Sequence, residues 1–248
     1  MNVTLIIPYY CNEEMLKRQV EEWRKYPDNI KIILVDDGSP QGRHAHPHMD
    51  KARSEGIDVR EFVILKDIPW NRGGARNLGT MKAETDWIIH TDIDHILPVD
   101  TAIALQEFQP AAGTYYRFSR YRVGKADFTR NKDDLPRDCE FGKIKPHMDS
   151  YLVERSLYMG LGGYDEDYSG GLGGGTPFVR ELQSAATMID LPEPFTLHVY
   201  TTDKVKDSSD VFLSRDTSRF KALQKKKARE RIPKKPMCQF DWVEIVDG

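Results

Sequence analysis

The chain is organised around the stretch Trp87-Ile88-Ile89-His90-Thr91-Asp92-Ile93-Asp94-His95-Ile96-Leu97-Pro98. Its apolar beginning predicts a buried strand, which ends in two carboxylates one residue apart and then in a proline that favours a loop. In open α/β sheets, ligands bind beyond the carboxyl ends of the strands. An Asp-x-Asp pair at such an end supplies hard oxygen ligands for Mg²⁺ or Mn²⁺, whose remaining positions phosphate oxygens can fill. Asp92 and Asp94 therefore predict a site for a metal and a diphosphate, unless they only cap a loop or the following helix.

The whole chain is consistent with one α/β domain built from two halves. Its 248 residues can bury a sizeable core, and alternating strand and helix patterns run from the amino terminus. We divide the single domain, residues 1–248, into the halves 1–98 and 99–205 and a basic C-terminal segment, 206–248. We expect the functional site to lie between the two halves.

Composition and charge limit the kinds of partner and site that the protein can have. The net charge is −3 and 30% of the residues are charged, which gives no global attraction for polyanions but does not exclude a nucleotide or nucleic acid. The three cysteines are far apart and form no Cys-x-x-Cys motif: Cys11, Cys139 and Cys238. Neither a zinc site nor a disulfide framework is indicated, so a reducing compartment fits best. With no leader-like amino terminus and no apolar run long enough for a bilayer, we expect a soluble, cytoplasmic protein without a transmembrane segment.

Strand patterns separated by helical ones fill the first half. We expect strands at residues 3–7, 31–35 and 59–65 and at the stretch that leads to Asp92. Pro8 is expected to end the first strand, and the carboxylates of Asp36 and Asp37 follow the second. Short hairpins cannot join parallel neighbours, so this alternation predicts a mainly parallel central sheet flanked by helices. The acidic residues should then meet at one edge of that sheet.

Two polar segments lie between these strands. Asn71-Arg72-Gly73-Gly74-Ala75-Arg76-Asn77-Leu78-Gly79 predicts a helix start with glycines and basic groups at its positive end. This is a candidate anion site, and the alternative is a flexible helix entry whose arginines are solvated. The other segment carries His44, His46 and His48, which we interpret as an exposed loop rather than a metal site because no cysteine accompanies them.

The second half is less regular. We expect a helix at 99–108, a strand at 114–123, a charged loop or insertion at 125–146, a helix at 176–188 and a strand at 194–200. The glycine-rich segment Gly160–Gly175 would permit close approach of a ligand to the backbone, or movement of a loop. Residues 208–231 predict a helix with a basic end, formed by Lys221, Lys225, Lys226, Lys227, Arg229 and Arg231. Such an end is either a solvated helix terminus or a binding surface.

Together these segments resemble the inverting-type glycosyltransferase family 2 and its relatives with the GT-A fold, over roughly residues 1–200. Four motifs in the family's order carry the resemblance: Thr4 to Glu14, Leu34 to Ser39, Asn71 to Gly79, and Asp92-Ile93-Asp94. Gly162-Gly163-Tyr164-Asp165-Glu166 is also similar to the acceptor-side Gly-Gly-Tyr-Asp-Glu of GT-A enzymes. The resemblance implies a Rossmann-like α/β domain in which 1–98 binds the nucleotide sugar and the smaller half, 99–205, faces the acceptor.

The resemblance also implies roles for single residues. Asp37 would contact the base and Arg76 would lie near the nucleotide, while Asp94, with Asp92, would hold Mn²⁺ or Mg²⁺ on the diphosphate. The set implied for donor binding is Pro8, Tyr10, Glu13, Asp37, Gly74, Arg76 and Asp92. His198 matches a position at which some relatives supply a metal-ligating histidine, although a histidine beside a core strand can be purely structural.

The chain departs from the family pattern on the acceptor side. Relatives usually carry a Gly-Gly-Glu-Asp type sequence whose acid serves as general base, whereas this chain has Gly173-Gly174-Gly175-Thr176. A hydroxyl that attacks an anomeric carbon must lose its proton, and help with this step is typically worth about 10²–10⁴ in rate. We predict that Asp165, Glu166 or Asp167 supplies it. The alternatives are a retaining reaction, in which the departing phosphate takes the proton, and a protein that has lost transfer activity.

The function that follows is a metal-dependent glycosyltransferase that passes a sugar from a nucleoside-diphosphate sugar, expected to be a UDP-sugar, to a hydroxyl. A nucleotidyltransferase also places paired carboxylates on a metal, but no glycine-rich nucleotidyl signature follows the first strand. A noncatalytic sugar-nucleotide or glycan-binding protein is the alternative suggested by Gly175 and Thr176. The acceptor is a glycan, a small molecule or, given the basic helix, a modified base in nucleic acid, which would have to be single-stranded or flipped.

Overall fold

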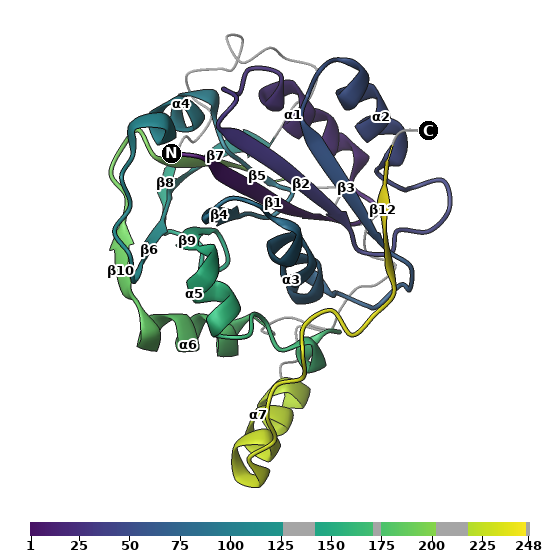
Figure 1. Ribbon diagram of the computed structural model, residues 1–248, viewed down its shortest axis with the longest axis vertical. Coiled ribbons are helices and arrows are strands. Elements are labelled where there is room, and N and C mark those ends of the chain that lie inside the picture. Colours follow the sequence, from purple (N-terminus) through teal and green to yellow (C-terminus); the bar gives the residue numbers. More distant parts are fainter. Residues whose placement is uncertain (126–141, 171–174, 202–217, 247–248) are drawn as a thin grey trace.

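The computed structural model describes residues 1–125, 142–170, 175–201 and 218–246 (Figure 1). The helices in these ranges are α1 (Glu13–Trp23), α2 (His46–Ser54), α3 (Arg72–Lys82), α4 (Val99–Glu107), α5 (Arg155–Gly160), the 3-10 turn η2 (Glu166–Tyr168), α6 (Thr176–Ala185) and α7 (Ser218–Glu230). The strands are β1 (Val3–Tyr9), β2 (Ile30–Asp36), β3 (Val59–Ile64), β4 (Trp87–His90), β5 (His95–Ile96), β6 (Thr114–Arg117), β7 (Ser119–Lys125), β8 (Gly142–Ile144), β9 (Tyr151–Glu154), β10 (Thr187–Asp190), β11 (Thr196–Thr201) and β12 (Trp242–Ile245). Among the helices of the described ranges, none combines the length and the apolar character that crossing a membrane requires.

The strands form two sheets, and the larger one lies between layers of helices (Figure 1). Its order is β10-β6-β9-β4-β1-β2-β3-β12, and the smaller sheet has the order β5-β11-β7-β8. β1 runs parallel to β2 and β4, and β2 runs parallel to β3. Leu5 packs in a cluster with Leu16 of α1 and Met49 of α2, whereas Ile6 packs in a cluster with Leu78 of α3, because successive side chains of a strand face opposite sides. The predicted α/β fold, a mainly parallel central sheet flanked by helices, is confirmed.

β1 continues past Pro8, so the prediction that this proline ends the strand is wrong. The backbone N–H of Thr91 donates to the carbonyl of Ile6 on the β4 side (3.2 Å), and the N–H of Asp37 donates to the carbonyl of Tyr9 on the β2 side (2.8 Å). Alternate residues of a strand present their backbone groups to opposite neighbours, so Pro8, like Ile6, faces the β4 side. β4 ends level with Ile6, and the N–H that Pro8 lacks is therefore not needed by a neighbouring strand.

Several boundaries predicted for the second half are also wrong. The single strand predicted at 114–123 is two strands, because β6 joins the larger sheet and β7 the smaller one. The helix predicted to extend to 188 ends at Ala185, because β10 follows at once and pairs in parallel with β6. The segment predicted as a charged loop at 125–146 contains β8, whereas residues 126–141 lie outside the described ranges.

The histidine segment predicted as an exposed loop begins a helix instead. α2 starts at His46 with a proline in its first turn, where the missing N–H has no helical partner to lose. The imidazole of His46 lies 3.2 Å from Glu61 of β3 and 3.1 Å from Asp50 of the same helix. These contacts tie α2 to the sheet.

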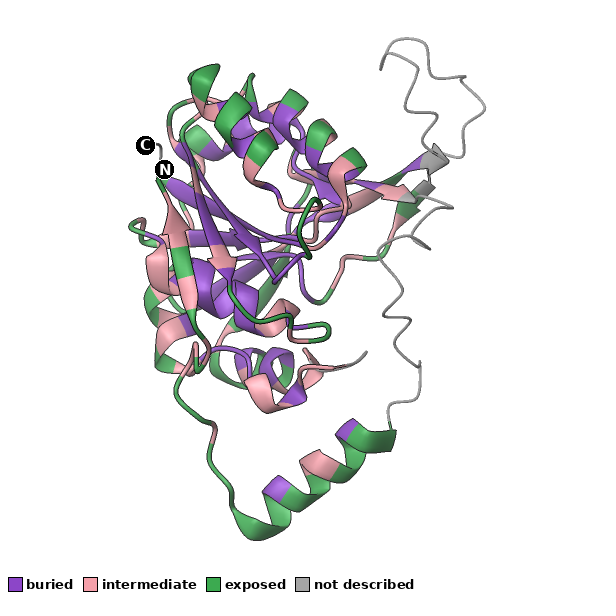
Figure 2. Cartoon of the chain, turned by 90° about the vertical axis from the view of Figure 1, so that its right-hand side faces the viewer, coloured by how far each residue is buried: buried purple, intermediate pink, exposed green. Residues whose placement is uncertain are grey.

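The C-terminal segment returns to the body of the protein. α7 is mostly exposed at one end of the molecule (Figure 2), but β12 then pairs antiparallel with β3. Trp242 of β12 packs edge-on against Phe62 with ring centroids 5.9 Å apart, as expected for a tail that packs on the core. Of the helix predicted at 208–231, the part from Ser218 is confirmed, and residues 202–217 lie outside the described ranges.

Candidate active site

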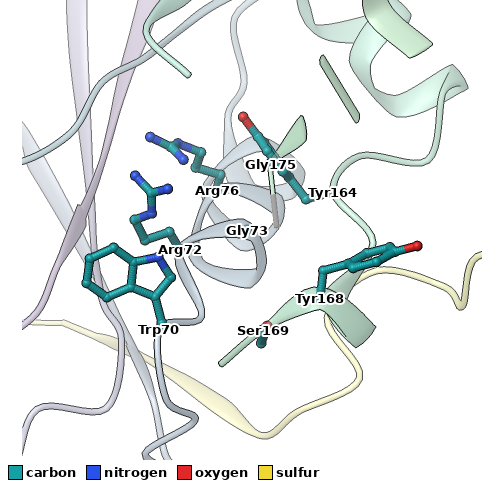
Figure 3. Close-up of a pocket in the computed structure, with 8 residues that line it drawn as sticks. All are labelled: Trp70, Arg72, Gly73, Arg76, Tyr164, Tyr168, Ser169 and Gly175. Atoms are coloured by element: carbon teal, nitrogen blue, oxygen red, sulfur yellow. The ribbon is translucent and has the colours of Figure 1, made fainter. Parts of the chain in front are cut away.

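A small hollow, open to solvent, lies beside the first turns of α3. Its lining residues are Trp70, Arg72, Gly73, Arg76, Tyr164, Tyr168, Ser169 and Gly175 (Figure 3). The guanidinium groups of Arg72 and Arg76 point in the same direction from α3 (Figure 3). Because the amino-terminal end of a helix and two guanidinium groups both attract anions, this region is suited to phosphate.

Asp92, which follows β4, is the carboxylate that these arginines hold. Arg76 donates to its Oδ1 at 2.5 Å, and Arg72 donates to the same atom at 3.3 Å. Arg76 is only 1% exposed, and a buried charge is costly unless it is paired. Burial alone would raise the pKa of Asp92, but the two arginines hold that pKa well below its usual range. The sequence predicted Arg76 at the donor site and gave Arg72 as one of the basic groups of the candidate anion site in the same motif.

Asp92 also belongs to a cluster that could hold a metal ion. One ligand atom from each of Asp92, His95 and His147 lies within 4.8 Å of the other two. Burial lowers the pKa of His95 to about 4 and also lowers the pKa of His147, so both imidazoles are neutral near pH 7. Neutral imidazoles and a carboxylate suit ions such as Mn²⁺. The residues present therefore fit a divalent cation.

Neither histidine of this cluster was predicted from the sequence as a metal ligand. His95 directly follows the Asp-x-Asp pair, and this adjacency was an available signal. His147 comes from the end of the segment predicted as a charged loop, where no local pattern marks it. Only the fold brings its Nδ1 to 3.6 Å from a carboxylate oxygen of Asp92.

Asp94 and His198, which were predicted as metal ligands, lie outside this three-residue cluster. Asp94 is half-buried, and burial together with the charge of Asp92 raises its pKa to about 7. Its carbonyl accepts a hydrogen bond from the N–H of Tyr200 at 3.0 Å. His198 lies two residues earlier on the same strand, β11, opposite Ile96 of β5. The fold thus brings β11 next to the Asp-x-Asp loop, and metal binding by Asp94 and His198 stays a prediction.

Asp37, predicted to contact the base of the donor, directly follows β2. It is 4% exposed, and its Oδ1 has no hydrogen-bond partner among the described residues. Burial raises the pKa of Asp37 well above its usual range, and the nearby polar groups of Asn71 offset this only in part. A buried oxygen without a donor is unfavourable in the free protein, so this atom is suited to accept an N–H from a ligand.

The other residues predicted to bind the donor lie near the same edge of the sheet. Pro8 is in β1, Tyr10 follows it, and Glu13 begins α1. Gly74 is in the first turn of α3, where an added Cβ would lie 2.4 Å from the side-chain oxygen of Asn71. That contact requires glycine at this position. Donor binding by these four residues stays a prediction.

The three carboxylates predicted to supply the general base contact the C-terminal segment. Lys227 of α7 lies 2.5 Å from Asp165 and 2.8 Å from Asp167. Glu166 accepts a hydrogen bond from the backbone N–H of Cys238 at 2.7 Å. Each carboxylate therefore has a structural contact that holds α7 or the residues after it. A catalytic role for any of the three stays a prediction.

Comparison with known proteins places this geometry in a family. A sequence model described as glycosyl transferase family 2 matches residues 4–164, which is more than half of the chain. No curated protein matches the sequence significantly. The matched range begins in β1 and ends at Tyr164, so it contains α3, the Asp-x-Asp loop and one wall of the hollow.

Solved structures share the fold at low sequence identity. S. aureus TarS 1-349 in complex with UDP has a TM-score of 0.62 and 14% identity, over 81% of this chain and 61% of that chain. The mannosyltransferase PcManGT from Pyrobaculum calidifontis, in complex with GDP-Man and Mn²⁺, has a TM-score of 0.57 and 18% identity, over 95% and 65%. GalNAc-T7 with UDP, GalNAc and Mn²⁺ has a TM-score of 0.59 and 15% identity, over 81% and 43%. The chain thus spans about 60% of the TarS structure, and these likenesses confirm the predicted GT-A architecture.

Proposed function

The chain belongs to glycosyl transferase family 2, and on that premise we propose that it transfers a sugar from a nucleoside-diphosphate sugar to an acceptor hydroxyl. The observation that carries this proposal is the constellation around Asp92, where two arginines and two neutral imidazoles gather beside a hollow. As a glycosidic bond to a diphosphate breaks, negative charge grows on the diphosphate. Positive groups fixed in advance stabilise that charge without reorganising during the reaction.

The proposed nucleotide is a uridine one. The buried Oδ1 of Asp37, which has no hydrogen-bond partner in the part of the chain that the structure describes, supports a base that offers an N–H, and the uracil ring offers one. The structures of TarS and GalNAc-T7 contain UDP, whereas that of PcManGT contains GDP-Man. Guanine also offers N–H groups, so uridine and guanosine donors must be compared directly.

The residues suited to hold Mn²⁺ or Mg²⁺ are Asp92, His95 and His147, with Asp94 and His198 as further ligands predicted from the sequence. When bound, the ion would act as a Lewis acid on the leaving diphosphate. The contribution of the chain itself is orientation. The paired arginines keep Asp92 ionised and in one position, and burial keeps the imidazoles neutral.

Thermal unfolding with a panel of UDP-sugars and GDP-sugars tests donor binding. A ligand that binds only the folded state stabilises it by about 2.7 kcal/mol at 100 times its Kd. We expect one nucleotide class to raise Tm, more strongly with Mn²⁺, and Asp92→Asn to remove the effect. Asp190→Asn is the matched control, because Asp190 lies on the edge strand β10 with its side chain 50% exposed. If no nucleoside-diphosphate sugar stabilises the protein, the proposed function is wrong.

Release of nucleoside diphosphate separates a transferase from a noncatalytic sugar-nucleotide or glycan-binding protein. A transferase releases it at a rate that depends on the acceptor, whereas a binding protein leaves the donor intact. Mixtures of glycan, small-molecule and single-stranded nucleic-acid acceptors, each with the donor found above, cover the acceptor classes expected from the sequence. Donor binding without release in every mixture would favour the noncatalytic alternative.

A nucleic-acid acceptor is a second candidate, and α7 favours it. The exposed basic residues of this helix and its end are Arg219, Lys221, Lys225, Lys226, Arg229 and Arg231. Such a surface attracts phosphates by releasing condensed counterions. Lys227 is not part of this surface, because it is buried and pairs with Asp165. The cytoplasmic location expected from the sequence would suit such an acceptor and stays a prediction.

A further inference from the structure

Gly175 leaves room for a carboxylate that comes from elsewhere in the chain. A Cβ added to Gly175 would lie 2.6 Å from Oδ1 and 3.0 Å from Oδ2 of Asp149. Such distances are far below ordinary van der Waals contact, so any larger residue at position 175 would displace the carboxylate. The carboxylate of Asp149, which comes from the loop before β9, thus occupies the space that a side chain at position 175 would need.

The carboxylate of Asp149 contacts side chains that line the hollow. Its side chain is 12% exposed, the hydroxyl of Tyr164 donates to Oδ1 at 3.1 Å, and Nη2 of Arg72 lies 3.5 Å from Oδ2. Tyr164, Arg72 and Gly175 all line the hollow (Figure 3). Asp149 is therefore held by Tyr164 and Arg72 next to the hollow, and its carboxylate lies close to the backbone of Gly175.

The carboxylates predicted from the sequence are placed differently. Asp165 and Asp167 are paired with the ammonium group of Lys227, which would compete with an acceptor proton. Within the described ranges, the cationic partner recorded for Asp149 is Arg72, which also donates to Asp92. When a donor engages the region around Asp92, that arginine can serve the diphosphate and leave the carboxylate of Asp149 available to accept a proton.

We propose that Asp149 is the catalytic residue that takes the proton of the acceptor hydroxyl; this rests on the proposed function. The acceptor oxygen forms a bond to the anomeric carbon, and the bond from that carbon to the diphosphate oxygen breaks. The electron pair leaves with the nucleoside diphosphate, and the hydroxyl proton goes to the carboxylate of Asp149. Such a single displacement inverts the configuration at the anomeric carbon.

The test uses the nucleoside-diphosphate sugar that gives the largest thermal shift, with the acceptor mixture that releases most nucleoside diphosphate. Asp149→Asn should lower kcat for release by about 100-fold or more, the size of general-base loss, while the Kd for the nucleoside diphosphate stays within twofold. Asp190→Asn, on the exposed edge strand, is the matched control. Calorimetric titration of the nucleoside diphosphate into Asp149→Asn shows that the variant is folded.

Moving the carboxylate provides a second measurement. Gly175→Asp alone should lose activity, because its side chain collides with Asp149. Combined with Asp149→Ala, the same substitution should recover at least tenfold over Asp149→Ala alone. The backbone at position 175 has φ −75° and ψ −23°, which aspartate adopts readily at the start of a helix.

Two results would overturn the inference. One is wild-type release by Asp149→Asn; the other is a fall in donor affinity that accounts for the whole loss of rate. In either case the proposed function would stand, because the wild-type protein still transfers. If the wild-type protein binds no sugar nucleotide at all, the proposed function fails and this inference fails with it.

Discussion

Asp94 provides a quantitative test of the electrostatics of the site in metal-free protein. Burial, followed by the charge of Asp92, raises the pKa of Asp94 from 3.8 to about 7, and Arg72 and Arg120 offset this only in part. A carboxyl group whose pKa is higher in the folded state reduces stability where it must ionise. The loss begins as pH rises above the unfolded pKa, near 4, and is complete above about 7. We therefore predict that Asp94→Asn stabilises the metal-free protein at pH 8 much more than at pH 4.5.

The magnitude follows from the shift. A displacement from 3.8 to about 7 is about 3 units, and each unit corresponds to about 1.4 kcal/mol, so the upper limit is about 4 kcal/mol. Asp94 is only half-buried, and water around the exposed part screens the interaction. We expect Asp94→Asn to raise the free energy of unfolding by about 2 kcal/mol at pH 8. Near pH 4.5 most of this difference should be absent, because wild-type Asp94 is then protonated in the folded protein.

Urea denaturation in a buffer with a metal chelator, at pH 4.5, 6 and 8, measures this difference. Asp190→Asn is the control, because Asp190 is exposed and bound to Arg117, and its effect should be below about 0.5 kcal/mol at every pH. A stability difference for Asp94→Asn that is the same at all three pH values would refute the reasoning. So would a variant that is less stable than the wild type at pH 8.

Three further predictions concern the metal, the basic helix and its anchor. For the metal, Asp94→Ala should abolish the Mn²⁺-dependent part of nucleotide affinity in isothermal titration and leave the fold intact. His147→Ala should weaken Mn²⁺ binding at least tenfold, because loss of even a residue that supports a metal ligand costs about 10–100-fold in affinity. If Mn²⁺ dependence is unchanged in a variant, the substituted residue is not part of the metal site. Charge reversal by Lys225→Glu and Lys226→Glu should flatten the salt dependence of binding to a labelled single strand, measured by fluorescence anisotropy, and leave donor affinity unchanged. An unaltered slope, or no binding at low salt, would leave α7 a solvated helix. Lys227→Ala should lower the free energy of unfolding by about 3 kcal/mol, because it leaves the buried carboxylate of Asp165 without its ion-pair partner. A loss below about 1 kcal/mol in urea denaturation would show that this ion pair does not anchor α7.

The first half of the fold could be predicted because its signals are local. β2 is buried along most of its length, and its residues from Ile32 to Val35 form an uninterrupted apolar run. α1 begins where Asn12 accepts a hydrogen bond from the N–H of Met15 at 3.3 Å, a contact within one turn. In both cases the residues that determine the element are neighbours in the sequence.

The rest of the fold depends on partners that are distant in the sequence. β10 is exposed at every position, and it is a strand only because Thr187 and the residues after it pair with β6 from Thr114 onward. Pro8 is tolerated inside β1 only because β4 ends level with Ile6. The pattern of apolar residues within one strand does not indicate where the neighbouring strand ends.

The candidate site divides in the same way. Asp92 and Arg76 lie in recognisable motifs, and the fold brings them to 2.5 Å from each other. His147 and Asp149 lie in a segment without periodicity, and neither belongs to a motif. Their importance comes from contacts with Asp92 and with Gly175, which the chain reaches only after folding.

The basic helix and the wall of the hollow are mechanically connected through lysines. Lys227 of α7 pairs with Asp165, and Lys234, which follows the helix, donates to the carbonyls of Leu161 and Gly163 at 2.9 Å each. The segment that these lysines hold is rich in glycine and turns and leads directly to Tyr164 in the wall of the hollow. Because such a segment has little regular hydrogen bonding of its own, its position depends on contacts from outside. Loss of Lys227 should therefore loosen this wall of the hollow as well as α7, although Lys227 is not among the residues that line it.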